Sequence, residues 1–267
     1  MGGVSGDFAV GQAGNPRWFG CAGISSVLFD ADITGNRGAA GAYLLRLKSA
    51  SSMKRAVDHL KKSDAILASI ITRVGPCKMA YREPTFEMLA RAIVFQQLNG
   101  KAARTIYGRL EEAAGGALTP QGIQNLSVGE MRRAGLSRQK LGYIRDLAEH
   151  AISGKVDFTR LPAMSDEEVI EALTDIKGVG IWTAHMFLMF SLRRPNVLPV
   201  GDLGVRMAIQ RFYCKRKLPT PKQIEQIARS WHPYCSFAAW YLWRSLELPK
   251  EKLVVETRRR IPKSRTK

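Results

Sequence analysis

Cysteine is scarce in this chain, and the copies present are far apart. The 267 residues include four cysteines, with no CxxC pair, and four histidines that are scattered along the sequence. This is too few for a disulfide framework in a chain of this length, and the spacing suits neither a zinc site nor a four-cysteine iron–sulfur cluster. We therefore expect reduced thiols and no structural metal.

Long apolar runs and targeting signals are also missing. The longest apolar run, around Ala184 to Leu192, is roughly half the ~20 residues that a membrane-spanning helix requires. At the N-terminus, Asp7 interrupts any basic stretch before an apolar one begins, and Gly6 stands where a myristoylation signal has Ser or Thr. These features predict a soluble protein of the cytoplasm.

Acidic residues are outnumbered by basic ones. The chain has 41 Lys and Arg against 23 Asp and Glu, which gives a formal net charge of +18. Such an excess predicts a polyanionic partner, because each phosphate that a protein neutralises releases counterions. Nucleic acid is the first candidate for this partner, and an anionic membrane surface is the second. If the partner is DNA, the protein would be associated with the nucleoid.

Composition divides the chain into three parts. Residues 1–52 are dominated by Gly, Ala and Ser and show no sustained apolar period, so we expect them to be disordered. Residues 53–249 are expected to form the folded domain. Residues 250–267 form a basic tail that we expect to be frayed. Nearly all of the positive charge therefore belongs to the domain and its tail.

Helical signals run through the whole domain. Apolar residues recur at helical spacing from Lys54 to Val74, with Ser63 and Asp64 as possible caps inside the run. Later helix starts have the capping-box spacing, in which Ser or Thr is followed three residues on by Glu, as in Ser127 with Glu130. No segment shows sustained strand alternation. The sequence predicts an all-α domain.

A Gly-Val-Gly turn stands between two predicted helices. Gly178, Val179 and Gly180 follow a helix that ends near Thr174 and precede one that begins near Trp182. Such a turn exposes N–H groups at a helix N-terminus, where an anion such as phosphate binds. The alternative is a plain helix–helix turn in which glycine only permits a positive φ. Spacing alone leaves both interpretations open.

An isolated acid, Asp202, stands before the predicted helix Leu203 to Phe212. A carboxylate so close to a phosphate-binding turn could act in catalysis. Aspartate is equally a favoured N-cap residue. The spacing does not decide between these two roles, and they are compatible.

Several motifs occur together in this chain: Gly178-Val179-Gly180-x-x-Thr183-Ala184, Val200-Gly201-Asp202, and the segments 95–103, 134–140 and 231–244. They resemble the helix–hairpin–helix (HhH-GPD) DNA glycosylases, in the branch of the DNA-3-methyladenine glycosylases II that acts on alkylated bases. The resemblance covers roughly residues 54–247. It implies an all-α glycosylase fold with two helical subdomains and the active site in the cleft between them.

The resemblance also implies the reaction. Bifunctional members carry a lysine where this chain has Trp182, so water is expected to be the nucleophile and no lyase activity is expected. Asp202 would stabilise the positive charge that develops on the sugar and would orient or deprotonate the water. The expected substrates are alkylated purines in duplex DNA, of the 3-methyladenine and 7-methylguanine type. The alternatives are another lesion (uracil, hypoxanthine or an oxidised purine) or a DNA-binding protein without catalysis.

The candidate base pocket contains aromatic and soft side chains. A cationic alkylated base is attracted to an aromatic face, so Trp182 is the first candidate. Core packing is the competing explanation for the other members, and only one of the three aromatics Trp240, Tyr241 and Trp243 is assigned to the pocket. The pocket candidates are Trp182, Met186, His185 and Trp240.

The candidate DNA-binding residues form three groups. The junction Gln96, Gln97 and Leu98 stands where the family places its wedge and strand-contacting residues, which fill the gap left by an extruded base. The alternative is that the two glutamines only cap a helix. Phosphate contacts are expected from Lys101, Arg138, Lys140, Lys177, Gly178, Val179 and Gly180. We expect a monomer that uses no cofactor, with a monovalent cation as a possible addition at the hairpin 176–181.

Overall fold

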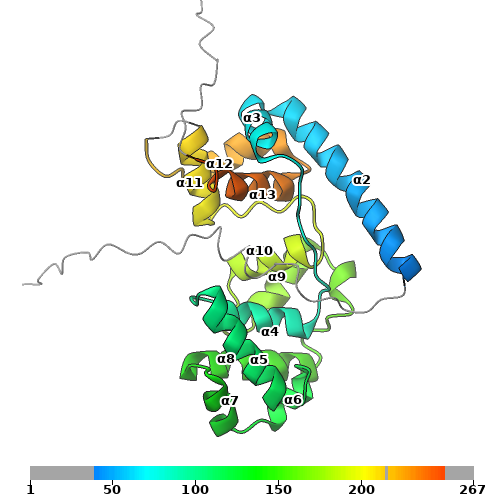
Figure 1. Cartoon of the computed structure of the whole chain (residues 1–267), viewed down its shortest axis with the longest axis vertical. Helices are drawn as coiled ribbons and strands as arrows, with labels where there is room; N and C mark the ends of the chain where they lie inside the picture. Colours follow the sequence, from blue (N-terminus) through cyan, green and yellow to red (C-terminus); the bar gives the residue numbers. More distant parts are fainter. Residues whose placement is uncertain (1–38, 214–215, 250–267) are drawn as a thin grey trace, which may run out of the picture.

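The computed structural model describes residues 39–213 and 216–249, and throughout these ranges the regular structure is helical (Figure 1). No strand occurs in them, so the predicted all-α class is confirmed. In the part of the chain that the structure describes, every helix is too short or too polar to span a bilayer. The helices are α2 (Ala39–Ser63), α3 (Ala65–Val74), α4 (Phe86–Phe95), α5 (Gly100–Ala113), α6 (Pro120–Asn125), α7 (Val128–Ala134), α8 (Arg138–Ile152), α9 (Asp166–Thr174), α10 (Ile181–Phe190), α11 (Leu203–Phe212), α12 (Pro221–Ala228) and α13 (Cys235–Ser245).

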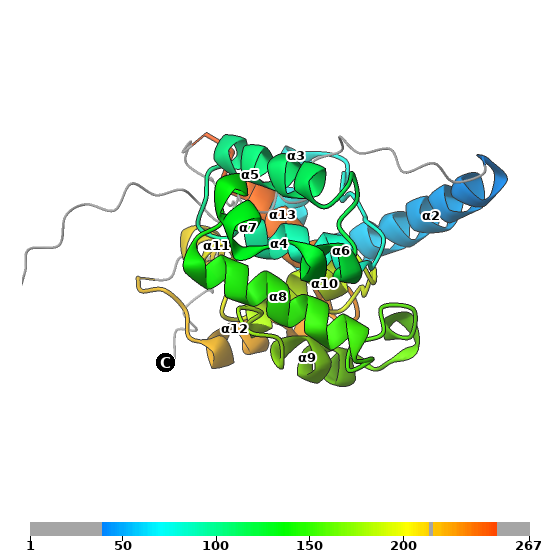
Figure 2. The same ribbon diagram turned by 90° about the horizontal axis from the view of Figure 1, so that it is seen from below.

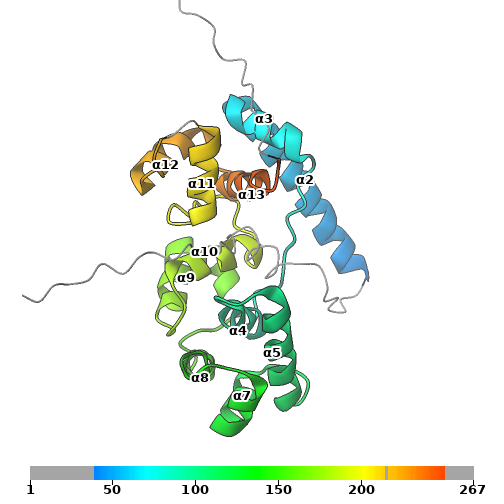
Figure 3. The ribbon, with the colours of Figure 1, turned by 60° about the vertical axis from the view of Figure 1, so that its left-hand side comes forward.

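The helices form two groups. One group contains α4 to α10, in which α8 packs against α4 and α6 while α5 packs against α7. The other contains α2, α3 and α11 to α13, in which α3 contacts both α2 and α13, and α13 contacts α11. Figures 1 and 3 show the two groups one above the other, with α10 facing the upper group. The two helical subdomains that the resemblance implies are therefore present.

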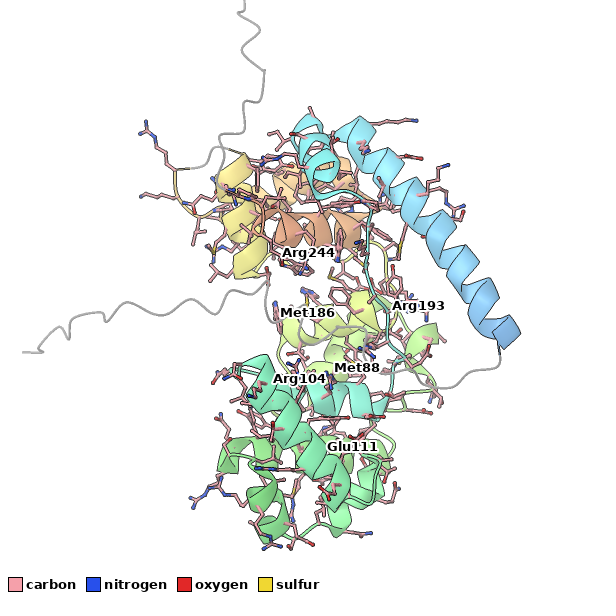
Figure 4. The ribbon with its side chains drawn as sticks, in the orientation of Figure 1. Met88, Arg104, Glu111, Met186, Arg193 and Arg244 are labelled. Atoms are coloured by element: carbon pink, nitrogen blue, oxygen red, sulfur yellow. The ribbon has the colours of Figure 1, made fainter. Side chains whose placement is uncertain are left out.

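The chain crosses between the subdomains twice, and the crossings are tied together. Residues 75–85 lead from α3 to α4, and residues 191–202 lead from α10 back to α11. The Arg82 N–H donates to the carbonyl oxygen of Phe190 at 2.9 Å. A guanidinium nitrogen of Arg193 lies 3.4 Å from the Glu83 carboxylate, and Figure 4 shows Arg193 beside these connections. These contacts hold the two crossings together where they run side by side.

Side-chain caps set the helix starts, as the local sequence predicts. Ser127 forms a capping box with Glu130 at the start of α7. Asp64 ends the α2 run and caps α3, accepting from the N–H groups of Ile66 and Leu67 at 2.9 Å. Its second oxygen also accepts from Tyr213 and Trp231. One predicted cap thus joins three elements of the upper subdomain.

The disorder expected for residues 1–52 is not found in residues 39–52, which belong to helix α2. Helix α2 begins at Ala39, so the expected boundary at residue 53 falls within the helix. The stretch 39–52 contains Ala, Leu, Arg and Lys, which favour helix, but Gly41 and the Ser51-Ser52 pair obscure its apolar period. The expectations of disorder for residues 1–38 and of fraying for residues 250–267 lie outside the described residues.

Candidate active site and nucleic-acid interface

Asp202 is a buried carboxylate that accepts three hydrogen bonds. It is the N-cap of α11, as one of the two sequence interpretations predicts, and only 2% of its surface is exposed. Oδ1 accepts from the backbone N–H of Val205 at 2.7 Å and from the indole Nε1 of Trp243 at 2.8 Å. Oδ2 accepts from the indole Nε1 of Trp182 at 2.7 Å. Burial with several donors fixes the orientation of the carboxylate.

The two indoles reach Asp202 from different subdomains. Trp182 belongs to the first turn of α10, and Trp243 lies on α13. The Trp243 ring is stacked on Phe190, with centroids 6.1 Å apart and planes 25° apart. Gly204 permits this approach, because a Cβ added there would lie 2.8 Å from Cδ1 of Trp243. The N-terminus of α11 is thus pressed against α13, with Asp202 between the two groups of helices.

A largely apolar pocket of about 10 Å³, the space of roughly one water molecule, lies beside Trp182, between α4 and α10. Trp182 and Met186, two of the predicted pocket residues, both line it. The contribution of α4 is one that the sequence reasoning missed, although Met88, Ala92 and Gln96 recur every fourth residue and so share a helix face. Figure 4 labels Met88 on α4 and Met186 on α10. The lining residues are Met88, Leu89, Ala92, Trp182, Thr183, Met186, Phe187 and Ser191.

The other two predicted pocket residues do not line this pocket. His185 is half-buried on α10, and burial lowers the pKa of its imidazole, against the opposing effect of Asp166. Trp240 is buried on α13, edge-on to Tyr241 with centroids 5.0 Å apart. The Arg244 guanidinium lies 6.0 Å from the Trp240 ring centroid. The role of His185 and Trp240 in base binding stays a prediction.

The hairpin that precedes α10 uses its two glycines differently. Gly178 has a φ of 84° and lies against the ring of Tyr143, where a Cβ would overlap the ring. Gly180 has a φ of −92°, and a Cβ there would meet nothing within 4 Å. Between them, Val179 is buried and its N–H donates to Ile176 at 3.0 Å. The positive φ at Gly178 agrees with the plain-turn interpretation, whereas Gly180 has no internal reason to be glycine.

The start of α10 is open to an anion. Gly180 is its N-cap and offers no side-chain hydrogen bond. The first N–H groups of a helix have no intrahelical partner, and the positive end of the helix dipole lies there. Both interpretations of the Gly-Val-Gly turn are thus compatible with this geometry.

Helix α8 supports the hairpin through two side chains. The Asp146 carboxylate accepts from the backbone N–H of Lys177 at 2.8 Å and from its Nζ at 2.7 Å. His150 is hydrogen-bonded through Nδ1 to the Asp146 carbonyl at 2.8 Å and through Nε2 to Asp175 at 3.0 Å. Burial raises the pKa of Asp146, but the hydrogen bonds from Lys177 outweigh it and hold that pKa below its ordinary value. The Lys177 side chain remains 75% exposed.

The junction between α4 and α5 is joined to the hairpin. Gln96 is the C-cap of α4, as the capping alternative predicts, and its Nε2 donates to the Gly178 carbonyl at 2.9 Å. Gln97 is exposed with a φ of 57°, and Leu98 is half-buried against the core. Lys140 points inward, donating to the carbonyls of Val94 and Gln96. The wedge candidates and the hairpin therefore form one connected surface.

The remaining basic candidates occupy helix starts. Lys101 and Arg138 are exposed in the first turns of α5 and α8, after the N-caps Asn99 and Ser137. Their side chains are free to reach a phosphate, and their assignment to DNA stays a prediction. In the part of the chain that the structure describes, no group of three or more His, Cys, Asp or Glu is placed to hold a metal ion.

Comparison with known proteins identifies the family. Residues 90–233 match the HhH-GPD superfamily base excision DNA repair proteins. The DNA-3-methyladenine glycosylase 1 of Schizosaccharomyces pombe is 35% identical over 205 residues, which cover 74% of this chain and 90% of the relative. A DNA-3-methyladenine glycosidase from Bacillus halodurans is 40% identical, with a TM-score of 0.66 over 71% of this chain and 88% of that structure. A 3-methyladenine DNA glycosylase from S. pombe, solved in complex with abasic DNA, is 34% identical. Its TM-score is 0.65, over 74% of this chain and 99% of that structure. The chain belongs to the HhH-GPD superfamily of base excision DNA repair proteins, in its DNA-3-methyladenine glycosylase branch.

Proposed function

We propose that this DNA glycosylase removes alkylated purines, of the 3-methyladenine and 7-methylguanine type, by hydrolysing their N-glycosidic bond in duplex DNA. The observation that carries the proposal is the buried Asp202 carboxylate, hydrogen-bonded to Trp182 at the edge of an apolar pocket. The relatives whose names refer to 3-methyladenine support this substrate class.

The reaction needs little from the protein besides charge and geometry. Methylation at N3 or N7 makes the base cationic, so it departs readily with the electron pair of its bond to the sugar carbon. The face of Trp182 attracts such a cationic ring. The Asp202 carboxylate stabilises the positive sugar and orients the water, which supplies a hydroxyl to the same carbon and loses a proton to Asp202 or to solvent. The products are the free base and an abasic site.

Water is the nucleophile in this proposal. Trp182 stands where bifunctional members of the superfamily carry an amine, and an indole cannot form a Schiff base with the sugar. The abasic strand therefore stays intact after excision. No cofactor takes part in bond cleavage.

DNA binding in the proposal combines the hairpin, the junction and the overall charge. Phosphate is bound by the open start of α10 after Gly180, with Lys177 beside it. Lys101 and Arg138 make further phosphate contacts, and Gln97 with Leu98 fills the space left by the extruded base. The relative solved with abasic DNA supports a duplex ligand. The protein acts as a monomer, in the cytoplasm at the nucleoid.

A monovalent cation at the hairpin 176–181 is part of the proposal. The carbonyl oxygens of Ile176, Gly178 and Gly180 each accept one hydrogen bond, from Val179, from Gln96 and from Ala184. A carbonyl oxygen has two lone pairs, so these three oxygens suit a hard cation. When bound, it would bridge hairpin carbonyls to a phosphate and would take no part in bond cleavage.

A panel of duplexes that each carry one lesion tests the substrate class. The released bases are identified by chromatography, and abasic sites are counted after alkali treatment. We expect release of 3-methyladenine and 7-methylguanine, with no strand break before alkali. Preferential release of uracil, hypoxanthine or 8-oxoguanine would assign another lesion. Duplex binding with a steep salt dependence and no abasic product would indicate a protein that only binds DNA.

A further inference from the structure

Lys140 holds two backbone carbonyls at the end of α4. Its Nζ donates to the carbonyl oxygens of Val94 and Gln96, both at 2.6 Å, and the side chain is half-buried. The last carbonyls of a helix lack intrahelical partners and carry partial negative charge, so an ammonium group placed there stabilises them. Lys140 thereby fixes the path of the backbone where it leaves α4.

Gln97, the residue that follows Gln96, adopts an unfavourable backbone conformation. Gln97 has a φ of 57°, in the left-handed region that disfavours any residue with a Cβ. Such a conformation persists where its surroundings impose it, and it is found often at functional sites. Here it turns Gln97 outward, next to Leu98, which is half-buried. The carbonyl that Lys140 holds on Gln96 is the one directly before this turn.

The same helix also supports the hairpin. Helix α8 packs against α4, and Figure 2 shows the two helices together. One turn beyond Lys140, Tyr143 lies under Gly178, and Asp146 holds Lys177 two turns beyond. Gln96, whose carbonyl Lys140 holds, donates through its side chain to Gly178. One face of α8 therefore fixes the junction and the hairpin in a single arrangement.

We propose that Lys140 is a positioning residue for base extrusion. Its ammonium group keeps the α4–α5 junction in the left-handed turn that presents Gln97 and Leu98 to the duplex, in register with the phosphate-binding hairpin. This inference rests on the proposed function and adds a residue whose charge acts on the protein backbone instead of on DNA. Loss of the ammonium group leaves the chemistry at Asp202 intact and slows the opening of a paired base.

Lys140 is charged at neutral pH and loses its charge in mild alkali. Burial lowers the pKa of its ammonium group to about 8, because the group has exchanged water for two carbonyls. The pKa is lowered, so the neutral amine dominates as the pH rises through 8. The titratable and charged side chains on the elements packed around it are Glu87 and Arg91 on α4, Glu130, Arg132 and Arg133 on α7, Arg138, Tyr143, Arg145, Asp146, Glu149 and His150 on α8, and Lys177 in the hairpin.

The test compares a paired with an unpaired lesion. The Lys140→Met variant keeps the apolar stem and loses the ammonium group, and Lys222→Met, an exposed lysine on α12, is the matched control. Single-turnover release of 7-methylguanine is measured opposite cytosine and opposite an abasic site, where extrusion needs no base pair to break. We expect the release rate of Lys140→Met to fall about tenfold or more on the paired lesion, the scale of a displaced positioning group. On the unpaired lesion the rate should fall about threefold or less. Lys222→Met should match the wild type on both.

If the release rate of Lys140→Met fell equally on both substrates, or fell on neither, the inference would be overturned. Wild-type protein that releases no 7-methylguanine would instead contradict the proposed function, so the two failures are distinct. If Lys140→Met does not fold, the inference is tested by the pH dependence of the release rates of the wild type and of Lys140→Arg. The wild-type rate on the paired lesion should fall relative to the unpaired lesion above about pH 8, whereas Lys140→Arg, which stays charged, should keep a constant ratio. A constant ratio for the wild type would also overturn the inference.

Discussion

The indole Nε1 of Trp182 donates to Oδ2 of Asp202 at 2.7 Å and so joins the two subdomains at the candidate catalytic carboxylate. The donor begins α10 in one subdomain, and the acceptor begins α11 in the other. In the proposed function, a substrate base that stacks on Trp182 therefore arrives next to Asp202. The Trp182 indole orients the carboxylate through this hydrogen bond, and in the proposed function it also recognises the base. The two roles have separate measurable effects.

Trp182→Phe separates them, because phenylalanine keeps an aromatic face and has no N–H donor. We expect substrate binding to change little and the single-turnover excision rate to fall about tenfold, somewhat less than the ~10²–10³ typical for loss of a catalytic donor. Binding is measured by titration of a lesion duplex, and the rate by base release. An unchanged rate with weakened binding would show that the indole N–H has no part in orienting Asp202.

Trp243→Phe removes the other indole donor to Asp202. Hydrogen bonds to charged groups contribute about 1.5–3 kcal/mol, so the free energy of unfolding should fall by at least this amount, measured by denaturant titration. Excision should fall as well. Trp231→Phe is the matched control, since it removes the hydrogen bond that another buried indole donates to Asp64. It should lose stability and keep the excision rate of its folded fraction; an equal loss of rate in both variants would contradict the role given to Trp243.

The two hairpin glycines should respond differently to alanine. Gly178→Ala puts a Cβ into the Tyr143 ring at a positive φ and should cost about 1–3 kcal/mol of stability. Gly180→Ala meets open space, so the thermal midpoint should stay near the wild-type value while duplex affinity falls, because the methyl group obstructs a phosphate at the start of α10. Calorimetry and binding titrations measure the two effects. Wild-type affinity for Gly180→Ala would argue against a phosphate at this position.

Acid should weaken the support of the hairpin. The pKa of Asp146 is lowered in the folded protein by its bonds to Lys177, so its contribution to stability is complete above the ordinary carboxyl pKa of about 4. It is lost as the pH falls through the lower, folded-state value. Asp146→Asn lacks the contribution at every pH. The difference in thermal midpoint between wild type and variant should therefore be present at pH 7 and should shrink below about pH 4; a difference that stays constant would contradict the ion pair.

Local signals in the sequence predicted the helix starts well, since caps such as Ser127 and Asp64 act within one turn. Choices that depend on tertiary packing could not be predicted. Trp240 and Trp243 lie on the same helix, and only the fold determines that Trp243 faces Asp202. Lys140 looks like any other basic residue in the sequence, because its inward direction depends on where α4 ends. The start of α2 at Ala39 was hidden by its weak apolar period.

Excision by Asp202→Asn tests the account most directly. The variant keeps the size of the side chain and removes the negative charge, so we expect single-turnover release of 3-methyladenine from methylated duplex DNA to fall about 10²–10³-fold or more. Affinity for an abasic duplex should remain close to that of the wild type, which shows that the DNA-binding surface is intact. Full excision activity in Asp202→Asn would contradict the catalytic role of this carboxylate.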